Sequence, residues 1–250
     1  MDKEHIRLAA SEKIGDFLLE NVHRTIYGKE NLDIARQHLQ EGSIFLYFPD
    51  FAKLNAILYG RIVREHLASF DNLAAIIALK HLDGERGLGN KVEGAIMKDW
   101  EKVYGVTIIP MIQNGDGHYE DSDHFNTRSL KQAAKFLRTP GHVLAIAPEG
   151  TRSKDNQLHK AQEGFEVLFK LGGKNVLALP LAGVHGPIRP MNTNTTVIAG
   201  KPFSYQDLLH DQELNPDVSL TDLAMVRMAK LLPTPNQGEY RDLVTSVRAA

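Results

Sequence analysis

The segment Val143-Leu-Ala-Ile-Ala-Pro-Glu-Gly-Thr-Arg-Ser153 carries the clearest structural signal in the chain. Its four apolar residues Val143 to Ile146 predict a short buried strand, and Pro140-Gly141 marks the turn before it. The apolar run ends at Pro148, and a polar cluster with one glycine follows. A buried strand that ends in such a turn is typical of the carboxyl edge of an α/β sheet, where binding sites lie.

The polar cluster consists of Glu149, Gly150, Thr151, Arg152 and Ser153. Gly150 allows a close approach of the backbone, and the planar guanidinium of Arg152 suits a phosphate group. Thr151 and Ser153 add hydroxyl groups. Taken alone, the cluster also fits a surface turn that contains a salt bridge.

Strands and helices are predicted to alternate along the chain. The strand candidates are short apolar runs, at residues 43–48, 73–79, 106–109, 143–146, 175–179 and 195–199. Proline is expected to end three of them, at Pro49, Pro110 and Pro180. The helix candidates have apolar residues at helical spacing, at residues 3–26, 31–40, 50–68, 91–104, 127–137, 164–171, 220–231 and 240–247. Residues 113–125 are polar and are predicted to be a loop.

This alternation predicts an α/β fold with a mostly parallel central sheet flanked by helices, and with helical extensions at both ends. We expect one domain over residues 1–250. It comprises an N-terminal helical extension (1–40), an α/β core (41–203) and C-terminal helices (204–250).

Composition narrows the class of protein. The 250 residues are 42% hydrophobic and 24% charged, as in ordinary globular proteins, and the net charge of −2 gives no basic field for nucleic acid. The chain has no cysteine, which excludes a disulfide framework, and its 11 histidines lack metal-site spacing.

The N-terminus has no apolar segment typical of a signal peptide, and no apolar run is long enough to span a membrane. We therefore expect a cytoplasmic location. A peripheral position on the inner face of a membrane is the alternative if the amphipathic 3–26 helix binds lipid rather than packing on the core.

The sequence Pro148-Glu-Gly-Thr-Arg-Ser153 resembles the third signature block of the PlsC-like glycerolipid acyltransferases, which act on glycerol-3-phosphate and 1-acylglycerol-3-phosphate. In that family the block binds the substrate phosphate. The resemblance implies that Glu149 to Ser153 bind substrate and that the fold is the acyltransferase α/β fold. Weaker matches in the same order, among them Gly28-Lys-Glu-Asn-Leu32 and Gly200-Lys-Pro-Phe203, extend it over residues 25–241.

The family's first block is His-x4-Asp after the first core strand, where the histidine acts as general base and the aspartate orients it. Asp50 and Asn55 stand at these positions, so the spacing is kept and both residue types differ. An aspartate ordinarily titrates near about 4 and is a weaker base than imidazole. Two other pairs have the His-x4-Asp spacing, at His66–Asp71 and His118–Asp123, and the second lies in a predicted loop that reaches the sheet edge more easily.

The second and fourth blocks are partly matched. Gly105 to Gln113 keeps the strand and proline of the second block, but Gln113 replaces the phosphate-binding arginine with an uncharged donor. Residues 176–183 match the apolar fourth block. They equally fit a plain core strand.

The resemblance implies an O-acyltransferase that moves a fatty acyl group from acyl-CoA or acyl-carrier protein to a glycerol-phosphate or lysophospholipid hydroxyl. The acyl donor is a co-substrate, and no metal or other cofactor is implied. Asp50 and Asn55 would occupy the catalytic positions. The alternative is a catalytically inactive relative that binds a phosphate-bearing lipid or partner through Glu149 to Ser153. A third possibility is an unrelated α/β binding domain.

Overall fold

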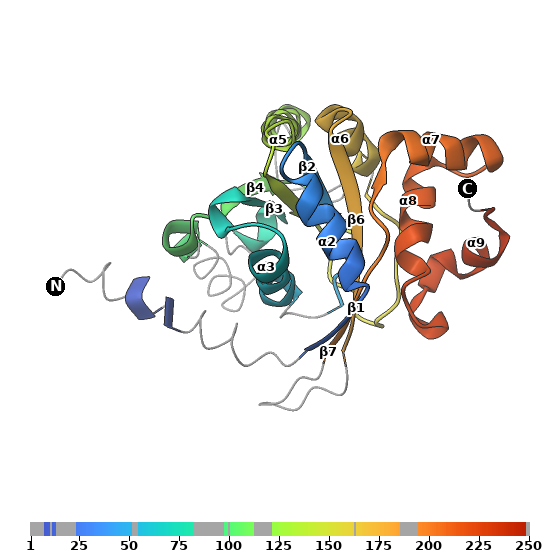
Figure 1. Ribbon diagram of the computed structural model, residues 1–250, viewed down its shortest axis with the longest axis horizontal. Coiled ribbons are helices and arrows are strands. Elements are labelled where there is room, and N and C mark those ends of the chain that lie inside the picture. Colours follow the sequence, from blue (N-terminus) through green and yellow to red (C-terminus); the bar gives the residue numbers. More distant parts are fainter. Residues whose placement is uncertain are drawn as a thin grey trace.

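The computed structural model describes residues 8–10, 12–13, 24–51, 55–82, 98–99, 101–112, 122–162, 164–185 and 195–248. They form an α/β fold around a mixed, mostly parallel sheet (Figure 1). The strands are β1 (Arg24–Tyr27), β2 (Ser43–Tyr47), β3 (Leu73–Ala78), β4 (Thr107–Met111), β5 (Val143–Ile146), β6 (Val176–His185), β7 (Thr195–Ala199) and β8 (Phe203–Ser204). Their order in the sheet is β1-β7-β6-β2-β5-β3-β4, and β8 pairs with β6.

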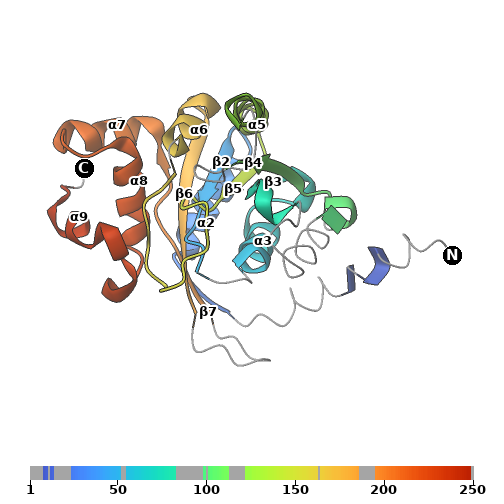
Figure 2. The ribbon, with the colours of Figure 1, turned by 180° about the vertical axis from the view of Figure 1, so that it is seen from behind.

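The α-helices are α2 (Lys29–His38), α3 (Asn55–His66), α5 (Ser122–Leu137), α6 (Phe165–Gly172), α7 (Tyr205–Leu214), α8 (Leu220–Ala229) and α9 (Arg241–Ser246). Short 3-10 turns lie at η1 (Phe70–Asn72), η2 (Leu79–His81), η3 (Thr234–Asn236) and η4 (Gly238–Tyr240). Helices α7, α8 and α9 gather at one end of the molecule beyond β6, as both ribbon views show (Figures 1 and 2). The predicted fold class is confirmed.

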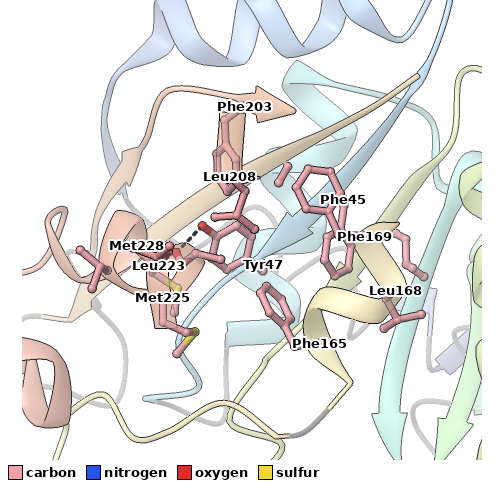
Figure 3. Packing of buried hydrophobic residues seen from close by; sticks show 14 of the residues in the cluster. Phe45, Tyr47, Phe165, Leu168, Phe169, Phe203, Leu208, Leu223, Met225 and Met228 are labelled. Atoms are coloured by element: carbon pink, nitrogen blue, oxygen red, sulfur yellow. Dashed lines mark hydrogen bonds between the residues drawn. The ribbon is translucent and has the colours of Figure 1, made fainter. Parts of the chain in front are cut away.

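The central strand β2 is buried along its whole length, and its side chains contribute to the core on both faces of the sheet. Successive side chains of a strand point to opposite faces. Phe45 and Tyr47 therefore pack with residues of α5, α6 and α8, and the tilted rings of Phe165 and Phe169 lie against them (Figure 3). Ile44 and Leu46 pack on the other face with residues of α2 and α3.

Strand β6 changes partners at Pro180. Its first half pairs in parallel with β2, ending with Pro180 opposite Tyr47, and its second half pairs antiparallel with β7 from Leu181 onward. The Pro180 carbonyl still accepts a hydrogen bond from the Gly200 backbone N–H at 2.9 Å. The predicted end of this strand at Pro180 is thus wrong, because proline is tolerated where the strand exchanges one neighbour for another.

The predicted strand end at Pro110 is also wrong. Strand β4 continues to Met111, and β4 is the last strand in the sheet order. A proline at a sheet edge removes no ladder hydrogen bond when its nitrogen faces away from the neighbouring strand.

The N-terminal helix predicted to run to residue 26 is wrong at its end, because Arg24–Tyr27 is strand β1 and pairs in parallel with β7. Residues 8–10 and 12–13 are helical, and 14–23 lie outside the described residues. Pairing with β7 gives the backbone of Thr25 and Ile26 partners that residue spacing alone did not predict, and both residue types favour strands.

Helix α5 begins at Ser122, so the predicted loop to residue 125 is wrong at its end. The Asn126 side chain binds both backbone groups of Ile112, at 2.8 Å each, which ties the start of this helix to the end of β4. Helix α7 was not predicted, although Ser204 and Asp207 form a capping box at its start. Among the described residues, no helix is long and apolar enough to cross a membrane.

The Tyr47 hydroxyl donates a 2.8 Å hydrogen bond to the Ala224 carbonyl and so joins the end of β2 to α8 (Figure 3). We expect Tyr47→Phe to lower the free energy of unfolding by about 1–2 kcal/mol, because a buried carbonyl loses a partner while ring packing is kept. Urea unfolding measures this change. Tyr27→Phe, at a side chain that is 58% exposed, is the matched control and should change stability by less than about 0.5 kcal/mol; equal effects of the two substitutions would contradict the role of the bond.

Candidate functional site

The candidate site lies where β2 and β5 end side by side. Tyr47 and Ile146 are paired at the carboxyl ends of these parallel strands. The pairing goes one step further, since the Phe48 backbone N–H donates to the Ile146 carbonyl at 3.2 Å. The segments that follow β2 and β5 therefore start next to each other, with Asp50 on the first and Glu149 on the second.

The buried carboxyl group of Glu149 links these two segments. One oxygen accepts a hydrogen bond from the Asp50 backbone N–H at 3.3 Å, and the other accepts one from the His159 backbone N–H at 2.8 Å. Glu149 is only 1% exposed. Burial raises its pKa to about 7, and the two backbone N–H groups offset part of that effect.

Behind Glu149 the backbone turns sharply and returns to Asp50. Gly150 has a φ of 70°, in the left-handed region that glycine adopts without strain, and its N–H bonds the Ala147 carbonyl at 3.0 Å. The Ser153 backbone N–H then donates to the Asp50 carbonyl at 2.9 Å. Asp50 is thus joined through its backbone to both ends of the cluster Glu149–Ser153.

This backbone arrangement brings two charged side chains together. The Arg152 Nε atom lies 3.9 Å from Asp50 Oδ1, an ion-pair distance, and the side chains are 28% and 23% exposed. Arg152 is the only positive charge in the cluster Glu149–Ser153, and it therefore pairs with Asp50, the residue predicted to occupy the catalytic position.

The hydroxyl groups of the cluster differ in their surroundings. Thr151 is exposed. Ser153 is buried, and its hydroxyl donates to Asp155 at 2.8 Å while accepting from the Gln157 backbone N–H at 3.1 Å. Ser153 therefore fixes the shape of the loop, whereas Thr151 faces solvent.

His159 connects the loop to the C-terminal part of the chain. One ring nitrogen lies 3.1 Å from Asp155 Oδ1, and the other lies 3.3 Å from Glu239 Oε1. The pKa of His159 is raised: partial burial opposes the charged form, and the two carboxylates outweigh it. The side chain is 40% exposed.

The same C-terminal segment holds the loop through backbone groups. Leu158 is fully buried, donates to the Asn236 carbonyl and accepts from the Glu239 N–H, at 3.0 Å each. A β-carbon on Gly238 would lie 2.1 Å from the Leu158 carbonyl oxygen, so this approach requires glycine. In Figure 2 the loop, in yellow, runs beside α8.

Tyr59 comes from α3, the helix that follows the segment with Asp50. It lies one turn into α3, and its ring stacks on Phe48 with 4.0 Å between centroids. Its hydroxyl is buried beside Gly183, where a β-carbon would lie 2.7 Å away. Burial raises the pKa of Tyr59, and the charges of Asp50 and Glu149 add to the effect. Gly183 belongs to the segment that resembles the family's fourth block.

Some predicted residues are not placed beside Arg152. Asn55 is the first residue of α3, and its side chain lies outside what is described. Gln113 and His118 lie outside the described residues. His66 ends α3, eleven residues and roughly 16 Å along the helix from Asn55.

His159, Glu239 and Tyr59 were not predicted as site residues. Tyr59 follows Asn55 by one helical turn, which is a usable signal because residues four apart share a face. One partner of His159, Glu239, lies 80 positions away in the chain, whereas the other, Asp155, lies only four positions away. Lys80 and His81 also follow a strand at this sheet edge, in η2 after β3. Among the described residues, no group of three or more potential metal ligands is present.

No protein-family model and no curated protein sequence matches the chain. A solved structure does match: the crystal structure of the 1-acyl-sn-glycerophosphate (LPA) acyltransferase PlsC from Thermotoga maritima, with a TM-score of 0.51 and 14% sequence identity. The match covers 91% of this chain and 79% of that chain. At this identity the comparison shows a shared fold.

The raised pKa of Glu149 predicts a pH-dependent stability. Its value of about 7 in the folded protein exceeds the ordinary 4.5, so the folded state holds the proton more tightly and stability is lost as pH rises from 4.5 through 7. We expect the stability difference between wild type and Glu149→Gln to shift by about 2–3 kcal/mol against wild type between pH 5 and pH 8. Urea unfolding at both pH values measures it. A difference that does not change with pH would mean that Glu149 titrates normally.

Proposed function

We propose that the protein is an acyltransferase-type protein that acts on a phosphate-bearing glycerolipid. The observation that carries the proposal is the position of Arg152, at the carboxyl end of β5 and 3.9 Å from Asp50 at the end of β2. The resemblance of Glu149–Ser153 to a phosphate-binding block and the fold shared with a lipid acyltransferase support it. The proposed substrate is a glycerol-phosphate or lysophospholipid, and the proposed donor is acyl-CoA or acyl-carrier protein.

In this proposal the phosphate of the acceptor binds the Arg152 guanidinium, and the acceptor hydroxyl lies next to Asp50. The Asp50 carboxylate accepts the hydroxyl proton as the oxygen attacks the thioester carbonyl carbon. The carbon–sulfur bond then breaks, and the thiolate takes up a proton as the ester forms. The chemistry uses the acyl donor as co-substrate and requires no further cofactor.

The hydrogen bonds that the Glu149 carboxyl group accepts hold this site in a fixed arrangement. They fix the Asp50 backbone relative to the turn that carries Arg152. A fixed distance between the phosphate-binding group and the base keeps the reacting hydroxyl in position, which is a main source of rate enhancement. A lipid acceptor would also require the protein to work at a membrane surface.

A second candidate function is lipid binding without catalysis. The residue type at position 50 favours it, because an aspartate is ordinarily a weaker base than an imidazole. Asp50 and Asn55 would then be remnants of a lost catalytic pair, and Arg152 would retain the phosphate-binding role.

Acyl transfer by the purified chain separates the two candidates. With acyl-CoA or acyl-carrier protein and a lysophospholipid, we expect transfer by the wild type and a loss of about 10–100-fold in kcat/KM for Arg152→Ala, since one charged hydrogen-bonding group is removed. Arg152→Lys should lie between them. Arg36→Ala, at an exposed ion pair on α2, is the control and should have no effect.

The double substitution Asp50→His/Asn55→Asp completes the design by restoring the family residues. Transfer seen only in this variant would overturn the catalytic proposal in favour of lipid binding. Wild-type transfer that survives Arg152→Ala unchanged would contradict the role given to Arg152.

A further inference from the structure

Asp50 occupies a place that bears directly on what Arg152 binds. Its carboxylate lies 3.9 Å from Arg152 Nε, which is buried, but both side chains are partly exposed, so a ligand can reach the exposed part of each from solution. The backbones beneath them are joined by the Ser153-to-Asp50 and Asp50-to-Glu149 hydrogen bonds. The carboxylate therefore stays next to any anion that approaches Arg152.

A second carboxyl group lies behind the first. Glu149 is buried directly under the backbone of Asp50, and the charge of Asp50 is among the causes that raise the pKa of Glu149. The two carboxyl groups therefore lie close together, beside the place where an anion would bind Arg152. Lys80 lies in η2 after β3, and β5 separates β3 from β2 in the sheet.

Phosphate groups differ in the charge that they would place next to Arg152 and Asp50. A phosphate monoester carries between about −1.5 and −2 near pH 7, since its second pKa is about 6. A diester carries −1 because its second acidic oxygen is esterified. The first charge of either group is met by Arg152, whereas the extra charge of the monoester is repelled by Asp50.

We infer that the group bound by Arg152 is a singly charged phosphodiester rather than a doubly charged phosphate monoester, and that Asp50 sets this preference. The acceptor class is then a lysophospholipid whose phosphate carries a second alcohol, and not glycerol-3-phosphate or lysophosphatidic acid. The inference rests on the phosphate-binding role proposed for Arg152. It holds whether or not acyl transfer follows binding.

Two soluble probes that share the glycerol-3-phosphoryl group test this preference. sn-Glycerol 3-phosphate is a monoester, and sn-glycero-3-phosphoglycerol is a diester. Isothermal titration calorimetry at pH 8 and low salt should show that wild type binds the diester more tightly. Asp50→Asn should tighten monoester binding by about tenfold, since the carboxylate that lies 3.9 Å from Arg152 loses its negative charge, and diester binding by clearly less.

Three further variants make the comparison specific. Asp50→Glu keeps the charge and should keep the preference. Asp33→Asn removes a carboxylate from an exposed ion pair with Arg36 on α2 and should leave both affinities unchanged. Arg152→Ala should weaken both ligands by about 10–100-fold.

The outcomes distinguish this inference from the proposed function. Tighter wild-type binding of the monoester, or an unchanged ratio of affinities in Asp50→Asn, overturns the inference and leaves Arg152 as a phosphate-binding residue. If Arg152→Ala weakens neither ligand, or neither ligand binds wild type, the phosphate role of Arg152 is contradicted and the inference falls with it.

Discussion

The buried carboxyl group of Glu149 is the constraint on which the candidate site depends. It is almost fully removed from solvent, and its two oxygens accept backbone N–H groups from Asp50, after β2, and from His159, ten residues further along its own loop. Side-chain bonds to backbone donors of this kind fix distances between segments that no regular element joins. The Ser153-to-Asp50 hydrogen bond and the Asp50–Arg152 ion pair add to this link between Asp50 and the turn after β5.

The C-terminal part of the chain completes this constraint from the other side. Leu158 is held between Asn236 and Glu239 by backbone bonds, and His159 lies between the carboxylates of Asp155 and Glu239. The loop after β5 is therefore supported along its length by residues about 80 positions away. Such support is expected where a site must keep its geometry although it lies in a loop.

The sequence predicted the sheet because its strands are short apolar runs, and β2 and β5 lie where their patterns placed them. It failed where tertiary partners override local pattern. Strand β1 exists because β7 is beside it, and β6 continues past Pro180 because it exchanges β2 for β7. The turn Glu149–Ser153 was recognisable from residue types that serve phosphate chemistry. The contacts of His159 with Glu239 depend on a chain reversal that no local pattern encodes.

The central claim is that Arg152 binds a phosphate next to the Asp50 carboxylate, which keeps its place beside the bound group. A crystal structure of the chain with bound sn-glycero-3-phosphoglycerol tests this most directly. The account predicts phosphate oxygens within about 3 Å of the Arg152 guanidinium, with the Asp50 carboxylate still beside the phosphate and the Glu149 bonds kept. A phosphate bound elsewhere, with the Asp50–Arg152 pair intact at its present distance, would contradict the account.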